Sequence, residues 1–237
     1  MGVGVSILTD AIDDELRALE ASLERRHRTR ETVIPLIGHE IRLLHPANAD
    51  ELISEADFVA DGRLPYWADL WPASRVLAAH LLANAGAGRR LLELGCGSGL
   101  VATAAQLAGY DVTATDYYAD ACDFARINGW RASGRDLRAH MLDWRQLPAD
   151  LGTWDVVVAS DVLYEHPYAP LVAAALARTI APTGVAWVAD PGRTALPAFL
   201  SACKLRALET GEPQKVAYDL DGQRQEIRIF TIRHAAR

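Results

Sequence analysis

A run of alternating glycines lies near the middle of the 237-residue chain, within the segment Leu91–Leu100. The apolar residues that open this segment predict a strand, and Gly95, Gly97 and Gly99 predict a loop that leads into a helix. Glycines let the backbone pass close under a ligand, and the start of a helix offers unpaired N–H groups. An ordinary tight turn would also fit, but three glycines in this context favour a binding loop.

The residues around these glycines narrow the class of ligand. A dinucleotide-binding loop needs another glycine at the position of Leu100. Glu93, two residues before Gly95, would repel a pyrophosphate, whereas it suits a cationic ligand that carries an ammonium and a sulfonium group. Cys96 lies inside the loop, and we therefore expect it at the same site.

Carboxylates also follow the next two predicted strands. Asp116 can accept hydrogen bonds from both hydroxyls of an adenosine ribose. Asp143 can receive the adenine amino group, and Trp144 can cover the ring. Each residue alone also fits a structural role, as a helix cap or a buried aromatic. The repetition favours function, because Glu93, Asp116 and Asp143 end three successive strands at the crevice where open α/β sheets bind ligands.

Short apolar strands alternate with helices after residue 88, and this pattern predicts the fold. Segments such as Asp155–Ser160 are apolar on both faces, which predicts a parallel sheet buried between helices. Asp221-Gly222 then joins two β-rich segments, as in an antiparallel hairpin. We therefore expect a Rossmann-like, doubly wound α/β fold. The expected strands are Arg90–Leu94, Asp111–Thr115, Leu137–Leu142, Asp155–Ser160, Val185–Ala189, Lys215–Leu220 and Gln225–Ile232, and the expected helices lie near Ala73–Asn84, Gly99–Ala108, Ala119–Asn128, Tyr168–Ile180 and Leu196–Leu208.

The N-terminal residues follow a different pattern. Helical spacing of apolar residues begins near Asp10, and two β-rich segments, Thr32–Ile37 and Glu40–Leu44, flank Gly38 as in a small hairpin. A segment rich in proline and aromatic residues then leads into the alternating part. The sequence therefore predicts a helical and hairpin extension over residues 1–64 and a main domain over residues 65–237.

Composition excludes several functional classes. The chain has 24 Lys and Arg residues against 31 Asp and Glu residues, a net charge of −7, so a nucleic-acid partner is not expected. No apolar run is long enough for a membrane span or a secretory signal. The three cysteines show neither a disulfide framework nor the spacing of metal ligands. These features predict a cytoplasmic protein without a metal site.

The Glu93–Gly99 loop, Asp116 and the terminal hairpin together resemble the class I S-adenosylmethionine-dependent methyltransferases. The segment Ala159–Tyr164 is similar to the Asp-x-x-Tyr signature that follows the fourth strand in the seven-β-strand protein-lysine methyltransferase group. Trp71 resembles that group's upstream tryptophan, and Asp143-Trp144 its adenine-side tryptophan. Ser160 departs from the pattern, because alanine or glycine is usual there, and this bears on cofactor packing.

The resemblance implies a seven-stranded sheet of order 3-2-1-4-5-7-6, with the last strand antiparallel, and S-adenosylmethionine as the cofactor. Glu93, Gly95 and Gly97 are then expected to face its methionine half and Asp116 its ribose. Asp143 and Trp144 would meet the adenine. Ser160 and Cys96 would pack near the cofactor, and Trp71 would cover the site.

The resemblance also implies in-line transfer of a methyl group to a nucleophile. Asp161 is expected to orient the acceptor as a hydrogen-bond acceptor, and Tyr164 to supply an apolar wall and a hydroxyl group. A helix cap and simple packing are the structural alternatives for these two residues. The resemblance of Asp161–Tyr164 and Asp190–Arg193 to the lysine methyltransferase group makes a lysine side chain of a partner protein the preferred acceptor. The net charge adds a physical reason, because an acidic enzyme attracts a lysine-bearing surface. A small-molecule amine or another nucleophile is the alternative.

Two hypotheses of other classes stay open at this stage. A catalytically silent module could retain the cofactor for stability, although it would not need Asp161 and Tyr164. A nicotinamide-dependent oxidoreductase would use a similar sheet. Among the remaining residues, Arg193 is interpreted as a solvent-facing loop residue, with a contact to the substrate as the alternative. The role of Trp67 is left open.

Overall fold

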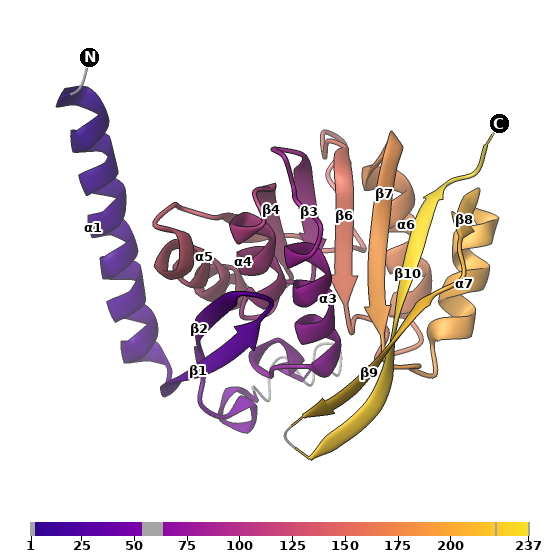
Figure 1. Cartoon of the computed structure of the whole chain (residues 1–237), viewed down its shortest axis with the longest axis horizontal. Coiled ribbons are helices and arrows are strands. Elements are labelled where there is room, and N and C mark those ends of the chain that lie inside the picture. The colour runs from indigo at the N-terminus through magenta and orange to yellow at the C-terminus, as the bar shows by residue number, and fades with distance from the viewer. Residues whose placement is uncertain (1–2, 54–63, 221, 237) are drawn as a thin grey trace.

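A sheet of eight strands runs through the centre of the computed structural model, which describes residues 3–53, 64–220 and 222–236 (Figure 1). The strand order is β5-β4-β3-β6-β7-β10-β8, and β9 pairs with β10. The chain runs from β3 outward to β5 and then returns to β6 on the other side of β3, so the sheet is doubly wound with its switch point between β3 and β6. The strands are β3 (Arg90–Leu94), β4 (Asp111–Asp116), β5 (Arg138–Met141), β6 (Trp154–Ser160), β7 (Ile180–Asp190), β8 (Leu208–Thr210), β9 (Gln214–Leu220) and β10 (Gln223–His234).

The order of the strands agrees with the predicted order, and one additional strand lies beside β10. Strands β5, β4, β3, β6 and β7 are parallel, and β10 pairs antiparallel to β7. The position expected for one strand beside β10 is shared by β8 and β9, because residues 211–213 interrupt the pairing. Beyond the part of β10 that pairs with β7, the β9–β10 ribbon projects from the sheet at the end where the parallel strands finish (Figure 1).

Helices cover both faces of the sheet, as the strand composition predicts. In β6, Val156 and Val158 pack in one core with α3, α4 and α5, whereas Val157 and Ala159 pack in the other with α6 and α7. Successive side chains of a strand point to opposite faces, so an apolar run is needed when both faces are buried. No helix in the described ranges is long and apolar enough to cross a membrane. The helices are α3 (Pro72–Leu82), α4 (Leu100–Leu107), α5 (Ala119–Ser133), α6 (Tyr168–Thr179) and α7 (Leu196–Leu205).

The predicted N-terminal helix and hairpin are both present. Helix α1 (Val3–Arg26) lies along α5 at one side of the molecule (Figure 1). Its Leu16 and Leu23 pack against Phe124 and Ile127 of α5. The hairpin of β1 (Thr29–Leu36) and β2 (His39–Pro46) packs on the main core. Two short 3₁₀ helices, η1 (Ala49–Leu52) and η2 (Tyr66–Ala68), lie on either side of the part of the chain outside the described residues.

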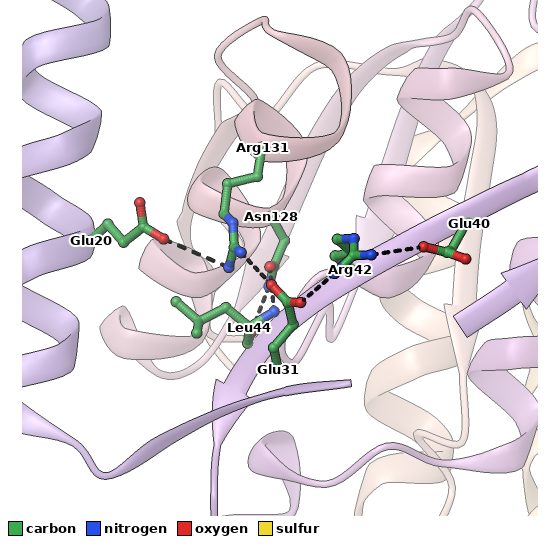
Figure 2. A network of polar contacts seen from close by, with 7 residues as sticks. All are labelled: Glu20, Glu31, Glu40, Arg42, Leu44, Asn128 and Arg131. Carbon is green, nitrogen blue, oxygen red and sulfur yellow. Dashed lines mark hydrogen bonds and ion pairs between the residues drawn. The ribbon is translucent and has the colours of Figure 1, made fainter. Parts of the chain in front are cut away.

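Polar contacts fasten the hairpin to α5, as Figure 2 shows. The side-chain amide of Asn128 in α5 forms two hydrogen bonds with the backbone of Leu44 in β2. Its Oδ1 accepts from Leu44 N at 2.7 Å, and its Nδ2 donates to Leu44 O at 2.7 Å. The same Nδ2 donates to Ser98 O in the glycine loop at 2.8 Å. Arg131 of α5 forms ion pairs with Glu31 of β1 and Glu20 of α1. The N-terminal elements are therefore tied to the loop that begins the binding site.

We predict that Asn128→Ala lowers the free energy of unfolding by about 3 kcal/mol, because it leaves three backbone groups buried without their partner. Urea unfolding at pH 7.5 measures the change. Asn84→Ala is the matched control, because the Asn84 side chain makes one exposed hydrogen bond to His80 O. We expect the control to lose less than about 1 kcal/mol. Equal losses in the two variants would contradict the role given to Asn128.

Buried His45 of β2 predicts a dependence of stability on pH. Burial, and then the neighbouring charge of Arg30, lowers its pKa to about 4. The unfolded chain therefore binds a proton near pH 6.5 that the folded chain does not bind until about pH 4, so stability falls as the pH drops through this window. We expect His45 to account for about 3 kcal/mol of that fall. Urea unfolding of His45→Gln between pH 7 and pH 4 should show a correspondingly shallower dependence, and the exposed control His39→Gln should match the wild type.

Candidate functional site

A cavity lies at the carboxyl ends of β3, β4 and β6, beside the switch point of the sheet. Glycine-loop residues, the ends of three strands and the η2 turn line it. Ten of the eleven predicted site residues are among its lining residues: Trp71, Gly95, Cys96, Gly97, Asp116, Asp143, Trp144, Ser160, Asp161 and Tyr164.

The glycine loop needs glycine at two positions for close approach. Gly97 has φ of +51°, and a Cβ atom there would lie 2.8 Å from Trp67 O of η2. Gly99 has φ of +84°, and a Cβ atom there would lie 2.5 Å from Ala125 Cα of α5. The loop is therefore held between η2 and α5. Trp67, whose role the sequence left open, bounds the site partly through its backbone.

Asp116, at the end of β4, lies against this loop. Its Oδ2 accepts a hydrogen bond from Gly97 N at 2.9 Å, and its Oδ1 accepts one from Tyr118 N at 3.1 Å. Burial raises the pKa of the Asp116 carboxyl, and these backbone hydrogen bonds oppose the rise. Each carboxylate oxygen can accept a second hydrogen bond. The residue can therefore meet a pair of ligand hydroxyls from a fixed position.

Glu93 is the predicted site residue that is not among the cavity's lining residues. It is 1% exposed in β3. Burial raises the pKa of its carboxyl well above the usual range, and the nearby Asp116 adds to the rise. Among the described residues, its Oε2 has no hydrogen-bond partner. The contact between Glu93 and a ligand that the sequence predicts therefore stays a prediction.

Aromatic rings form one wall of the cavity. Tyr164 contacts Tyr66 with ring centroids 5.0 Å apart and Tyr168 at 5.1 Å. The ring centroids of Tyr168 and Trp144 lie 6.1 Å apart, and those of Tyr66 and Trp71 lie 6.2 Å apart. Burial, followed by the neighbouring Tyr168, raises the pKa of Tyr164 far above its usual range, so its hydroxyl group stays protonated. Tyr66 belongs to the segment rich in proline and aromatic residues, whereas no spacing in the sequence marks Tyr168 of α6 as a residue of the site.

Asp161 lies directly after β6 in a strained conformation. Its φ is +55°, in the region that favours glycine, and its backbone N donates to Ala189 O of β7 at 2.9 Å. Its side chain is only 2% exposed. Non-glycine residues with such dihedrals cluster at functional sites, because the surrounding structure must hold them. Asp161 is among the residues that line the cavity, so this conformation holds a buried carboxylate at its wall.

The interpretation of Arg193 as a solvent-facing loop residue was wrong. Arg193 Nε donates to Asp161 Oδ1 at 2.7 Å, and its guanidinium lies 5.2 Å from the ring centroid of Trp71. The turn before it is built by Asp190, whose Oδ1 accepts from the backbone N of Gly192 and of Arg193. The sequence Asp-Pro-Gly-Arg is typical of such a turn. It does not indicate the contact with Asp161, which lies 32 residues away in the sequence.

A second arginine, Arg145, pairs with another carboxylate of the site. Its Nε and Nη2 donate to the carboxylate of Asp143, and its guanidinium lies 5.3 Å from the ring centroid of Tyr117. Asp143 is thus paired within its own loop, next to Trp144. The two residues expected to meet an adenine lie together at the cavity wall.

The lining residues fit the adenosine part of S-adenosylmethionine. Asp116 offers carboxylate oxygens to two hydroxyl groups, and Trp144 offers an indole beside the aromatic wall. Within the described part of the chain, no group of three or more His, Cys, Asp or Glu side chains is placed to hold a metal ion.

A model of the family described as lysine methyltransferase matches residues 62–197, more than half of the chain. The chain belongs to the lysine methyltransferase family. The electron transfer flavoprotein β subunit lysine methyltransferase of Xenopus laevis is 35% identical over 135 residues, 54% of this chain and 53% of that protein. The protein of the same name in Danio rerio is 32% identical over 116 residues, 44% of this chain and 41% of that protein. The matches thus span about half or less of these relatives.

A solved structure gives the same result for the fold. SMU.776, described as a methyltransferase complexed with SAH, aligns with a TM-score of 0.61 at 14% identity, over 85% of this chain and 55% of that one. The predicted Rossmann-like architecture and the resemblance to S-adenosylmethionine-dependent methyltransferases are confirmed.

We predict that Gly97→Ala weakens binding of S-adenosylhomocysteine at least tenfold, because the added Cβ atom would displace η2 or the loop that contacts Asp116. Isothermal titration calorimetry measures the affinity. Gly134→Ala is the control: its φ is +68°, but its Cβ atom would meet nothing within 4 Å. It should lose about 1 kcal/mol of stability and keep its affinity. Equal affinities in the two variants would contradict the steric argument.

Proposed function

We propose that the protein transfers the methyl group of S-adenosylmethionine to a lysine side chain of a partner protein. The observation that carries the proposal is the placement of two buried carboxylates in one cavity. Asp116 ends β4 and Asp161 follows β6, and both strands neighbour β3. Two strand spacings amount to about 10 Å, which leaves room for a bound cofactor and an acceptor between the two groups.

On the cofactor side, residues of the chain bind and orient S-adenosylmethionine. Asp116 accepts hydrogen bonds from the ribose hydroxyls, and Trp144 and Asp143 contact the adenine. Gly95, Cys96 and Gly97 let the backbone approach the methionine half, and Ser160 borders it. When bound, S-adenosylmethionine supplies an electrophilic methyl group, and transfer leaves S-adenosylhomocysteine.

On the acceptor side, the chain positions a neutral amine. Asp161 accepts a hydrogen bond from the amine and directs its lone pair at the methyl carbon. Tyr164 and Tyr66 supply an apolar wall that excludes water, and Trp71 covers the site. Holding the attacking atom in line at near-attack distance is the main catalytic task, because positive charge leaves sulfur during transfer.

A protein acceptor is supported by the relatives and by charge. The relatives from Xenopus laevis and Danio rerio are both named as lysine methyltransferases of a protein subunit. A net charge of −7 favours encounter with a surface that carries lysines. The cytoplasmic location, and partners that include neither nucleic acid nor membrane, remain predictions from the sequence.

Binding of the cofactor is tested first. We expect isothermal titration calorimetry to give micromolar affinity for S-adenosylhomocysteine and no binding of NADH. Asp116→Asn should weaken the affinity about 30-fold, because charge-assisted hydrogen bonds are lost. Asp219→Asn, which affects an exposed pair with Arg224, should bind normally. Binding of NADH alone would instead support the oxidoreductase hypothesis.

The acceptor is tested by label transfer. Radiolabelled S-adenosylmethionine is incubated with the enzyme and a mixed protein extract, and labelled residues are identified by mass spectrometry. We expect label on lysine, and at least a tenfold lower initial rate with Asp161→Asn while its affinity for S-adenosylhomocysteine changes less than twofold. Label confined to small molecules would refute the protein acceptor, and no transfer at all would support a silent module.

A further inference from the structure

We propose that Arg193 is a positioning residue of the methyl-transfer site: it neutralises Asp161 and fixes its orientation, so that the acceptor lysine binds as a neutral amine. This inference rests on the proposed function. It assigns a role to a residue that the sequence pattern placed in solvent.

The first observation is the geometry of the Asp161–Arg193 pair. Nε donates to Oδ1 at 2.7 Å and Nη2 donates to Oδ2 at 3.1 Å, so the contact is bidentate. Bidentate arginine–carboxylate pairs fix orientation as well as charge. One hydrogen bond on each oxygen leaves further acceptor capacity for an amine.

The second observation is that Arg193 is itself held from two directions. Its backbone N donates to Asp190 Oδ1 at 2.8 Å, and its guanidinium lies over the Trp71 ring. Its side chain is 33% exposed, whereas that of Asp161 is 2% exposed. Arg193 therefore reaches a buried carboxylate from a fixed turn at the edge of the site.

The chemistry of lysine explains why this pairing matters. An amine attacks the methyl group only after it has lost its proton. A buried carboxylate without a partner would stabilise the ammonium form and raise the amine's pKa by 1 unit or more. A carboxylate already paired with a guanidinium is nearly neutral, so it can orient the amine without holding the proton.

Two further buried carboxylates lie near the pair, and in their ionised form they would add to the effect of an unpaired Asp161. Asp190 at the end of β7 is buried and faces Asp161, and Asp116 faces the cavity from β4. The Arg228 guanidinium of β10 lies beside Gly192 and opposes these acidic groups. The further groups are Glu165 after β6, near Tyr164, and the phenols of Tyr164, Tyr168 of α6 and Tyr66 of η2, which are neutral when protonated.

The test measures the initial rate of lysine methylation in the mixed protein extract from pH 6 to pH 10. The variants are Arg193→Gln, which removes the charge, and Arg193→Lys, which keeps the charge but loses the bidentate contact. Arg224→Gln is the matched control, because Arg224 forms an exposed pair with Asp219 on the β9–β10 ribbon. Affinity for S-adenosylhomocysteine is measured for each variant.

We expect Arg193→Gln to move the pH of half-maximal rate upward by about 1 unit. At pH 7.5 this shift corresponds to a roughly tenfold lower rate, and the rate should recover at high pH. Arg193→Lys should keep the wild-type midpoint with a lower maximal rate. Both variants should bind S-adenosylhomocysteine within twofold of the wild type, and Arg224→Gln should match the wild type throughout.

Three results would overturn the inference. A uniform loss of rate with an unchanged midpoint in Arg193→Gln would show a purely structural role, and a large loss of affinity for S-adenosylhomocysteine would place Arg193 on the cofactor side. Both leave the proposed function intact. A wild-type protein that methylates no lysine at any pH would overturn the proposed function and this inference together.

Discussion

The burial of carboxylates at one edge of a parallel sheet is the constraint on which the site depends. Glu93, Asp116, Asp161 and Asp190 are all buried near the carboxyl ends of their strands. Removing such groups from water is unfavourable unless hydrogen bonds or opposite charges compensate. The loops supply such compensation to three of the four: backbone N–H groups reach Asp116 and Asp190, and a guanidinium reaches Asp161. The loops are therefore shaped by the charges that they must stabilise.

That constraint also explains where the backbone is unusual. The glycine loop takes positive φ values so that Gly97 can donate its N–H group to Asp116. Asp161 adopts φ of +55°, and its backbone is fixed by a hydrogen bond to β7 and its carboxylate by Arg193. A conformation of this kind persists only where several contacts determine it together. The contacts that pair the charge of Asp161 therefore also hold its backbone in this conformation.

The sequence predicted the elements well, because their signals are local. Apolar runs such as that of β6 mark strands buried on both faces, and the order of the sheet followed from the resemblance. Strand β8 was missed, because three residues carry no periodicity. The contacts of Arg193 with Asp161 and of Asn128 with Leu44 were missed for another reason: they join residues 32 and 84 positions apart, and only the folded chain brings them together. Residue types in the sequence were enough to predict which residues line the cavity. The hydrogen bonds and ion pairs between them became visible only in the structure.

The same limit applies to the division at residue 64. As a pattern in the sequence, residues 1–64 differ from the rest, yet in the structure Ile34, Ile41 and Leu43 of the hairpin pack in the same core as α3 and α4. The Asn128 amide joins the backbone of β2 to Ser98 of the glycine loop. A displacement of the hairpin would therefore pull on the loop that presents Gly97 to Asp116. The N-terminal elements act as structural support for the cofactor side of the site, which gives the region without a recognisable motif a physical reason to stay folded against α5.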